Sequence, residues 1–267
     1  MRVKVHSIYD QFKNHREVEG EPFINLYVDT NCTNETIEPN SIAVLIEPRS
    51  IQPGIYKWME EHYEQFRYVF THDSWLLNRC ENSKLILWGG GGGGIVECEH
   101  VPKTKDVSFV SSDKTMCIKH QERISLAKQL ESYPYVDVKG TYNGGRFVGP
   151  EKIYQKYRYS IAYENHIDYD WFSEKICNCF INRVVPIYIG AVHIGKYFNL
   201  DGVLVCDSNT DVLHRIEWLS KGGFEEFYNS DDVQFAIKDN YYRVQQYANF
   251  ETWFFNTYGE LLDDIYS

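Results

Sequence analysis

The sequence predicts an α/β protein in which most strands run parallel. Short runs rich in β-branched and aromatic residues alternate with segments of helical periodicity over most of the 267 residues, which is typical of repeated strand–helix units. Hydrophobic residues make up 43% and aromatic residues 16% of the chain, as expected for a globular protein that folds throughout. The length exceeds that of one ordinary domain, so we expect two.

The expected strands are short runs of mainly apolar residues that end in turn-forming or polar residues. They span residues 3–8, 42–47, 68–71, 84–88, 107–112, 135–138, 159–164, 185–190 and 203–207. The segments between several of these runs have apolar residues at helical spacing. The expected helices span residues 54–65, 118–131, 171–182, 209–220 and 223–238, with a final aromatic-rich helix over about 240–263.

The best candidate domain boundary is the polar, proline-containing stretch EHVPKTKD at residues 99–106, because such stretches commonly join compact units. We therefore expect an N-terminal α/β lobe over residues 1–104 and a C-terminal α/β lobe over 105–238. Residues 239–267 are expected to form a terminal helix that packs back across the lobes. A cleft between two such lobes, at the carboxyl ends of the strands, is where nucleotide ligands usually bind.

The formal net charge of −11 argues against nucleic acid or an anionic membrane as a partner, because no overall positive field attracts them. A small anionic ligand needs only one or two local cations and is not excluded. The seven cysteines are odd in number and lack a pair of zinc-binding motifs, so reduced thiols are expected. The N-terminal segment MRVKVHSIYDQF has no apolar signal-peptide core, and no stretch is apolar enough to span a membrane. A cytoplasmic location is expected from these features.

A run of six glycines, Gly89–Gly94, follows the expected strand at 84–88. A phosphate-binding P-loop would need a lysine followed by serine or threonine, whereas this run continues as Ile95-Val96-Glu97. We favour a loop whose glycines permit unusual backbone dihedral angles. A loop of this kind at a strand end is also suited to closing over a substrate.

Residues 164–175, ENHIDYDWFSEK, gather several polar groups between two apolar runs. Here we expect a buried strand to end, and a helix to begin at Trp171 with Asp170 as its cap. Lys175 then lies in the first helical turn, where unpaired backbone N–H groups favour an anion and disfavour a cation. The lysine therefore indicates an anionic partner, which is either a ligand phosphate or the neighbouring Glu174 and Asp170. Taken one at a time, these residues are better explained by a surface turn or a core anchor than by a binding site. Their joint pattern is what favours a site.

The run YSIAYENHIDYDWFSEKICNCFINRVVPIYIGA at residues 159–191 resembles the donor-binding signature of the α1,3/4-fucosyltransferases of glycosyltransferase family 10. The resemblance rests on the order and spacing of Glu164, Asn165, Glu174, Lys175, Pro186 and Gly190. It continues in FVSSDK (109–114), RISLAKQL (123–130) and YVDVKG (135–140), so that about residues 107–220 are covered. Nearer the N-terminus, IAVLIEPRS (42–50) and VFTHDSWLL (69–77) are similar to the family at fewer positions.

This resemblance implies a GT-B fold, with two Rossmann-like lobes and a cleft between them, and an inverting transfer of fucose from GDP-fucose to a glycan hydroxyl. By matching position, Arg123 and Lys175 would hold the donor diphosphate, and Asn165 and Glu174 would bind donor hydroxyl groups. Trp171 stands where the family usually has tyrosine. Ser173 stands where it has threonine, and retains the hydroxyl.

The acceptor hydroxyl must lose its proton during attack on the anomeric carbon, and a carboxylate is a suitable base. Glu47 matches the position of the family's catalytic glutamate, although it also suits a structural pairing with Arg49. His72, in VFTHDS, more often corresponds to a buried structural group than to a catalytic one. The resemblance implies a metal-independent GT-B enzyme, so we expect neither a metal nor another cofactor to be required.

Two alternatives remain open at this level. One is a glycosyltransferase that uses another nucleotide sugar or a non-glycan acceptor, because the motif does not determine the donor base or the acceptor. The other is a non-catalytic protein that binds sugar nucleotides. The acceptor, the linkage and the oligomeric state are not predicted.

Overall fold

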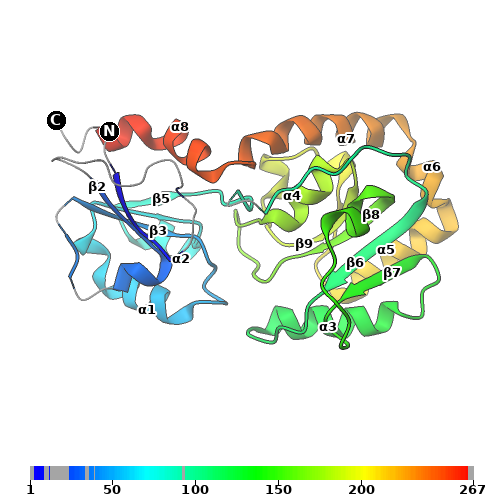
Figure 1. Ribbon diagram of the computed structural model, residues 1–267, viewed down its shortest axis with the longest axis horizontal. Coiled ribbons are helices and arrows are strands. Elements are labelled where there is room, and N and C mark those ends of the chain that lie inside the picture. Colours follow the sequence, from blue (N-terminus) through cyan, green and yellow to red (C-terminus); the bar gives the residue numbers. More distant parts are fainter. Residues whose placement is uncertain are drawn as a thin grey trace. The chain divides into compact units, whose positions relative to one another are not determined.

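The computed structural model describes residues 3–8, 12, 24–33, 36–38, 40–91 and 94–263. The chain divides into two compact units, one formed by Met1–Gly93 with Tyr247–Ser267 and the other by Gly94–Gln246. Each unit contains a five-stranded sheet (Figure 1). All the strand pairs of the described residues are parallel, which confirms the predicted α/β class. The units divide at residues 93–94 and 246–247, whereas the sequence places the divisions at 104–105 and 238–239.

The sheet of the first unit has its strands in sequence order. They are β1 (Val3–His6), β2 (Ile24–Val28), β3 (Ser41–Leu45), β4 (Tyr68–Thr71) and β5 (Ser83–Leu85). The helices of this unit are α1 (Pro53–His62), α2 (Ser74–Arg79) and α8 (Phe250–Asp263), with short 3₁₀ turns η1 (Asp29–Thr33) and η2 (Tyr63–Gln65).

Both faces of this sheet are buried, which explains why its central strands are apolar throughout. Successive side chains of a strand point to opposite faces. Leu26 and Val44 pack with Phe254 of α8, whereas Ala43 and Leu45 pack with α1 and α2. The helix at the C-terminal end of the chain thus completes a core built from the N-terminal strands.

The sheet of the second unit has the order β10-β9-β8-β6-β7. Its strands are β6 (Lys105–Ser111), β7 (Val136–Gly140), β8 (Tyr157–Tyr163), β9 (Val185–Ile189) and β10 (Leu204–Val205). Its helices are α3 (Ile118–Leu130), α4 (Glu174–Ile181), α5 (Asn209–Gly222), α6 (Phe224–Tyr228) and α7 (Asp231–Val244). A π-helical turn, η3 (Glu151–Gln155), precedes β8.

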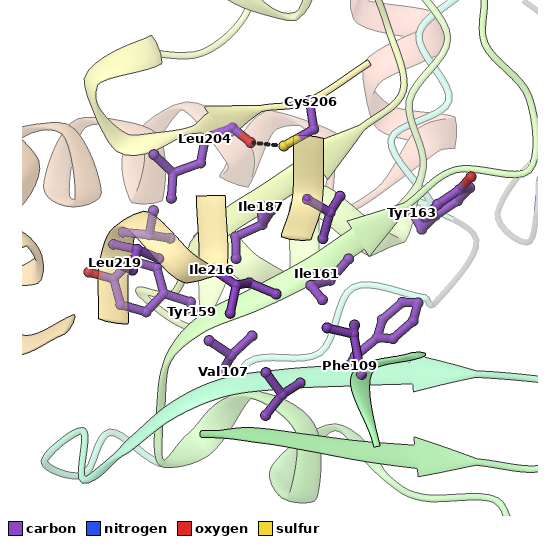
Figure 2. Close-up of a cluster of buried hydrophobic side chains, with 14 of the residues drawn as sticks. Val107, Phe109, Tyr159, Ile161, Tyr163, Ile187, Leu204, Cys206, Ile216 and Leu219 are labelled. Carbon is purple, nitrogen blue, oxygen red and sulfur yellow. Dashed lines mark hydrogen bonds between the residues drawn. The ribbon is translucent and has the colours of Figure 1, made fainter. Parts of the chain in front are cut away.

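A hydrophobic cluster joins the strands of this sheet to α3 and α5. Figure 2 shows Val107 and Phe109 of β6 and Ile161 of β8 in one cluster with Ile187 of β9 and Ile216 of α5. These side chains hold β6, β8 and β9 in the centre of the unit. This packing consequently holds the carboxyl ends of β6 and β8, and the polar residues there, in fixed positions.

The predicted elements differ from the structure mainly at their ends. Strand β2 and helix α2 were not expected, although INLYV is a run of strand-forming residues. The segment predicted as one helix over 223–238 is two helices, α6 and α7, which separate at Asn229 and Ser230. The final helix begins at Phe250 rather than near residue 240, because residues up to Val244 belong to α7.

The first glycines of the run at 89–94 pack closely against the segment that enters α8. Gly89 and Gly90 have positive φ angles of 57° and 82°, which glycine adopts without strain. A Cβ at Gly91 would lie 2.5 Å from the backbone N of Phe250 and 2.7 Å from the carbonyl O of Tyr247. Close packing therefore requires glycine at Gly91. The remainder of the run includes residues 92 and 93, which lie outside the described residues.

Candidate functional site

The second unit contains a cavity of about 350 Å³ at the carboxyl ends of β6, β7 and β8. This is the usual position of a ligand site in a parallel α/β sheet. The cavity is lined by Val110, Ser111, Ser112, Arg123, Gly140, Thr141, Phe147, Val148, Pro150, Ile153, Tyr154, Ile161, Tyr163, Glu174, Lys175 and Asn178. Three of the predicted site residues, Arg123, Glu174 and Lys175, therefore meet at one cavity.

Arg123 is the more deeply buried of the two cations, with 6% of its surface exposed. Its guanidinium donates to Asn165 Oδ1 (3.0 Å) and Ser112 Oγ (2.8 Å), both of which are neutral. Its Nε is buried and has no hydrogen-bond partner among the described residues. Burial lowers the pKa of the Arg123 guanidinium below its ordinary value, because desolvation disfavours the charged form. An anion in the cavity would compensate this charge.

Lys175 lies beside two carboxylates. Its Nζ is 2.9 Å from Ser173 Oγ, 3.1 Å from Glu174 Oε1 and 3.3 Å from Glu164 Oε2. Burial acts to lower the pKa of Lys175, but the charges of Glu174 and Glu164 outweigh it, and the net pKa is raised. The lysine is therefore protonated and held in one orientation at the cavity wall.

Glu164 stabilises the positions of Ser173 and Lys175. It is fully buried, and it accepts hydrogen bonds from the backbone N of Ser173 (2.9 Å) and from Ser173 Oγ (2.7 Å). Burial is the largest influence on its carboxyl group and raises its pKa. A Cβ at Gly190 would lie 2.6 Å from Glu164 Cγ and 2.1 Å from the Tyr188 hydroxyl. The glycine of the matched motif thus allows the chain to pass close to Glu164.

The prediction that Asp170 caps a helix beginning at Trp171 is wrong. Helix α4 begins at Glu174, and Ser173 is its N-cap, with its hydroxyl accepting from the backbone N of Lys175 (3.4 Å). Asp170 instead accepts a hydrogen bond from the Tyr197 hydroxyl (2.7 Å). The carboxylate predicted as a cap is thus used in a tertiary contact, and the helix begins three residues later than the sequence predicts.

The other predicted donor-binding residues, Asn165, Trp171 and Ser173, are not among the residues that line the cavity. Asn165 orients Arg123, and Ser173 contacts Lys175. Trp171 is buried and packs edge-on against His166, with ring centroids 6.0 Å apart. Their roles toward a donor remain predictions.

The sequence assigned no role to Ser112, Glu164 or Phe147. Glu164 carried a signal, because a carboxylate at the end of an apolar strand requires a buried partner. Phe147 lies in a polar, glycine-rich stretch where no pattern distinguishes it.

Replacing Ser173 by alanine should lower the free energy of unfolding by about 1–2 kcal/mol. The change removes the N-cap of α4 and a hydrogen bond to the buried Glu164. Ser173→Thr retains the hydroxyl and should remain close to the wild type. Urea unfolding of the three proteins checks this, and equal stability of Ser173→Ala and the wild type would contradict it.

Glu47 lies in the first unit, two residues after β3, where neighbouring side chains hold its backbone. Asp29 Oδ1 accepts from the backbone N of Ile46 (2.7 Å) and of Glu47 (3.2 Å), and the Tyr56 hydroxyl donates to the Glu47 carbonyl (2.7 Å). His72 is buried, with Nε2 3.2 Å from the Ile46 carbonyl O. This contact agrees with the structural interpretation of His72.

Arg49, the residue considered as a structural partner of Glu47, pairs with two other carboxylates. Its Nε lies 2.7 Å from Asp73 Oδ2, and its Nη1 lies 2.5 Å from Glu60 Oε1. The side-chain hydrogen bond with Asp73 is the main reason that the pKa of Arg49 is raised. Arg49 is thus paired with Asp73 and Glu60, and the role of Glu47 as the base stays a prediction.

Asp29 should make the stability of the protein depend on pH near neutrality. Burial raises the pKa of its carboxyl group from 3.8 to about 7, and the charge of Glu47 adds to this. The folded state then binds a proton that the unfolded state has lost. The contribution of Asp29 to stability is therefore fully present below the unfolded pKa and is lost as pH rises through about 7. Between pH 6 and pH 7 the wild type should lose about 1 kcal/mol more than Asp29→Asn.

Urea unfolding of both proteins at the two pH values measures this difference. The asparagine variant keeps an oxygen that can accept from the backbone N–H groups of Ile46 and Glu47, so it changes the charge more than the geometry. An identical pH dependence in the two proteins would contradict the assignment of a raised pKa to Asp29.

The chain has two α/β units, each built on a parallel sheet, and one of them has a cavity at the carboxyl ends of its strands. These features define the class of the protein as GT-B-like. An α1,3-fucosyltransferase with GDP has this fold, with a TM-score of 0.56 at 13% identity over 94% of this chain and 92% of that chain. TarM matches with a TM-score of 0.58 at 11% identity, over 90% of this chain and 54% of that chain. An α1,3-fucosyltransferase with GDP-fucose matches with a TM-score of 0.50 at 13% identity, over 88% and 80%. The structural similarity establishes the fold, whereas sequence identities this low do not establish the activity.

The family is indicated by the sequence of the second unit. Residues 101–207, which are less than half of the chain, match the model of the C-terminal domain of glycosyltransferase family 10 (fucosyltransferase). The matched segment contains Arg123, Asn165, Glu174 and Lys175, and the resemblance inferred from their spacing is confirmed there. Comparison with curated proteins gives no significant match. Among the described residues, no helix has both the length and the apolar character needed to cross a membrane.

Proposed function

We propose that this protein is an inverting glycosyltransferase that transfers fucose from GDP-fucose to a glycan hydroxyl. The observation that carries the proposal is the convergence of Arg123 and Lys175 on one cavity. Arg123 has only neutral hydrogen-bond partners among the described residues, and it keeps a buried donor without a partner there. Arg123 and Lys175 together suit a diphosphate, whose oxygens accept several charge-assisted hydrogen bonds.

In the proposed reaction, the two cations stabilise the negative charge that develops on the GDP leaving group. A preorganised pair is effective because it does not need to reorient as the glycosidic bond breaks. Glu174 accepts hydrogen bonds from donor hydroxyl groups at the same wall. Glu47 removes the proton of the acceptor hydroxyl as that oxygen attacks the anomeric carbon from the opposite side, which inverts its configuration.

Binding of GDP, UDP and TDP and of their sugar derivatives, measured by thermal shift and calorimetry, tests the donor assignment. A nucleotide present at 100 times its dissociation constant stabilises the folded protein by about 2.7 kcal/mol. We expect GDP and GDP-fucose to give the largest shifts, and Arg123→Ala to reduce them. A preference for UDP or TDP sugars would remove the fucose assignment and leave a transferase with another donor.

Transfer is tested by release of GDP from GDP-fucose in the presence of a panel of glycan acceptors. Acceptor-dependent release and a fucosylated product identified by mass spectrometry support an enzyme. Tight GDP-fucose binding without release on any acceptor would favour the non-catalytic alternative.

A further inference from the structure

Many of the residues that line the cavity of the second unit fall into two groups of different character, which we call its polar wall and its apolar wall. One wall is polar, with Ser112, Arg123, Glu174 and Lys175, and holds both cations. The other wall is apolar, formed by Phe147, Val148, Pro150, Ile153 and Tyr154 from the connection between β7 and β8. A ligand that fills the cavity should therefore have a charged part and a flat or apolar part.

Phe147 is the most exposed large hydrophobic side chain among the described residues, at 87%. None of the other exposed large hydrophobic residues of the described chain lines this cavity. An exposed aromatic ring beside a charged cavity is suited to binding a ligand, because covering the apolar ring with the ligand is favourable.

The connection that carries Phe147 is anchored at both ends. At its start, Thr141 Oγ1 donates to Asp113 (2.8 Å), and the Tyr142 hydroxyl and Asn143 Nδ2 donate to Glu131 Oε1 (2.6 and 3.0 Å). At its end, the chain enters η3 directly after Pro150.

The glycine that begins this connection is required by its conformation. Gly140 has a φ of +109°, and a Cβ there would lie 2.1 Å from the Ser111 carbonyl O. The backbone at the start of the connection is thus held against β6.

We propose that Phe147 stacks on the purine base of the donor nucleotide and makes binding depend on that base. This inference rests on the proposed function, because it takes the diphosphate to lie at Arg123 and Lys175. Of the two ends of a sugar nucleotide, the hydroxyl-rich sugar suits the polar wall with Glu174, whereas the planar base suits the apolar wall. Bases stack on aromatic side chains through their π faces with little dependence on hydrogen bonding.

Calorimetric titration of Phe147→Ala with three ligands tests the proposal. GDP should bind about 5- to 150-fold more weakly than it binds to the wild type. Inorganic pyrophosphate and fucose 1-phosphate, which lack a base, should bind with unchanged affinity. Phe147→Trp retains an aromatic face and should keep GDP binding near the wild-type value, whereas Phe147→Leu should resemble the alanine variant.

Phe235→Ala is the matched control, since Phe235 is a phenylalanine of the same unit that is 68% exposed and lies on α7 away from the cavity lining. It should bind all three ligands as the wild type does.

Wild-type GDP affinity in Phe147→Ala would overturn the stacking proposal, but it would not contradict the donor assignment. An equal loss for GDP and pyrophosphate would also overturn it, because the effect would not depend on the base. A wild-type protein that binds pyrophosphate but not GDP would refute the donor assignment itself, and the stacking role with it.

Discussion

Alanine at Arg123 or at Lys175 should slow the proposed fucosyl transfer by about 10²- to 10³-fold while the fold stays intact. Each substitution removes one positive charge from the cavity wall, so the leaving diphosphate loses one charged hydrogen-bond donor. Arg123→Ala is the clearer of the two, because Arg123 makes no ion pair within the described residues. Lys175→Ala also leaves the buried Glu164 without its cation, so some loss of stability should accompany the loss of activity.

Initial rates with GDP-fucose and circular dichroism of each variant measure both effects. Lys128→Ala provides the control, since Lys128 lies exposed near the end of the same helix as Arg123, and it should transfer fucose at the wild-type rate. Arg123→Lys keeps the positive charge and tests whether the hydrogen-bond geometry of the guanidinium group is also needed. Lysine cannot reproduce the two hydrogen bonds to Asn165 and Ser112, so only part of the activity should return. Wild-type turnover in Arg123→Ala would refute the role assigned to it.

Replacing Glu47 by glutamine should lower the transfer rate by about 10²- to 10⁴-fold, which is the usual contribution of a general base. Glutamine has nearly the same shape and cannot accept the proton of the acceptor hydroxyl. GDP binding should be unchanged, because the residues proposed to hold the donor belong to the second unit and Glu47 belongs to the first. A lowered rate with normal GDP affinity therefore separates loss of the base from loss of the donor site.

The pH profile provides a second test of Glu47. The wild-type rate should rise as a carboxyl group loses its proton, and this acidic limb should be absent from the residual activity of Glu47→Gln. Glu61→Gln, at an exposed position on α1 of the same unit, should keep both the rate and the limb. An unchanged rate in Glu47→Gln would exclude this residue as the base.

Much of the fold could be predicted because strands and helices have local patterns. Strands such as β8 and β9, and helices such as α3 and α5, were located within a few residues by periodicity alone. The missed strand β2 and the break between α6 and α7 also have local signals, since INLYV is a run of strand-forming residues and Ser230 is followed by Asp231 and Asp232. By contrast, the packing of α8 on the first sheet, where Phe254 meets Leu26 and Val44, joins segments that are distant in sequence.

The sequence by itself determined the α/β class and the resemblance to glycosyltransferase family 10, since both depend on residue types at fixed spacings along the chain. It also singled out Arg123, Glu174 and Lys175. Only the tertiary structure decided that these three line one cavity, that Ser173 rather than Asp170 caps α4, and that Phe147 stands at the cavity wall. These features arise where strands and loops that are far apart in sequence end side by side, and their geometry is set by packing and hydrogen bonds that no local pattern records.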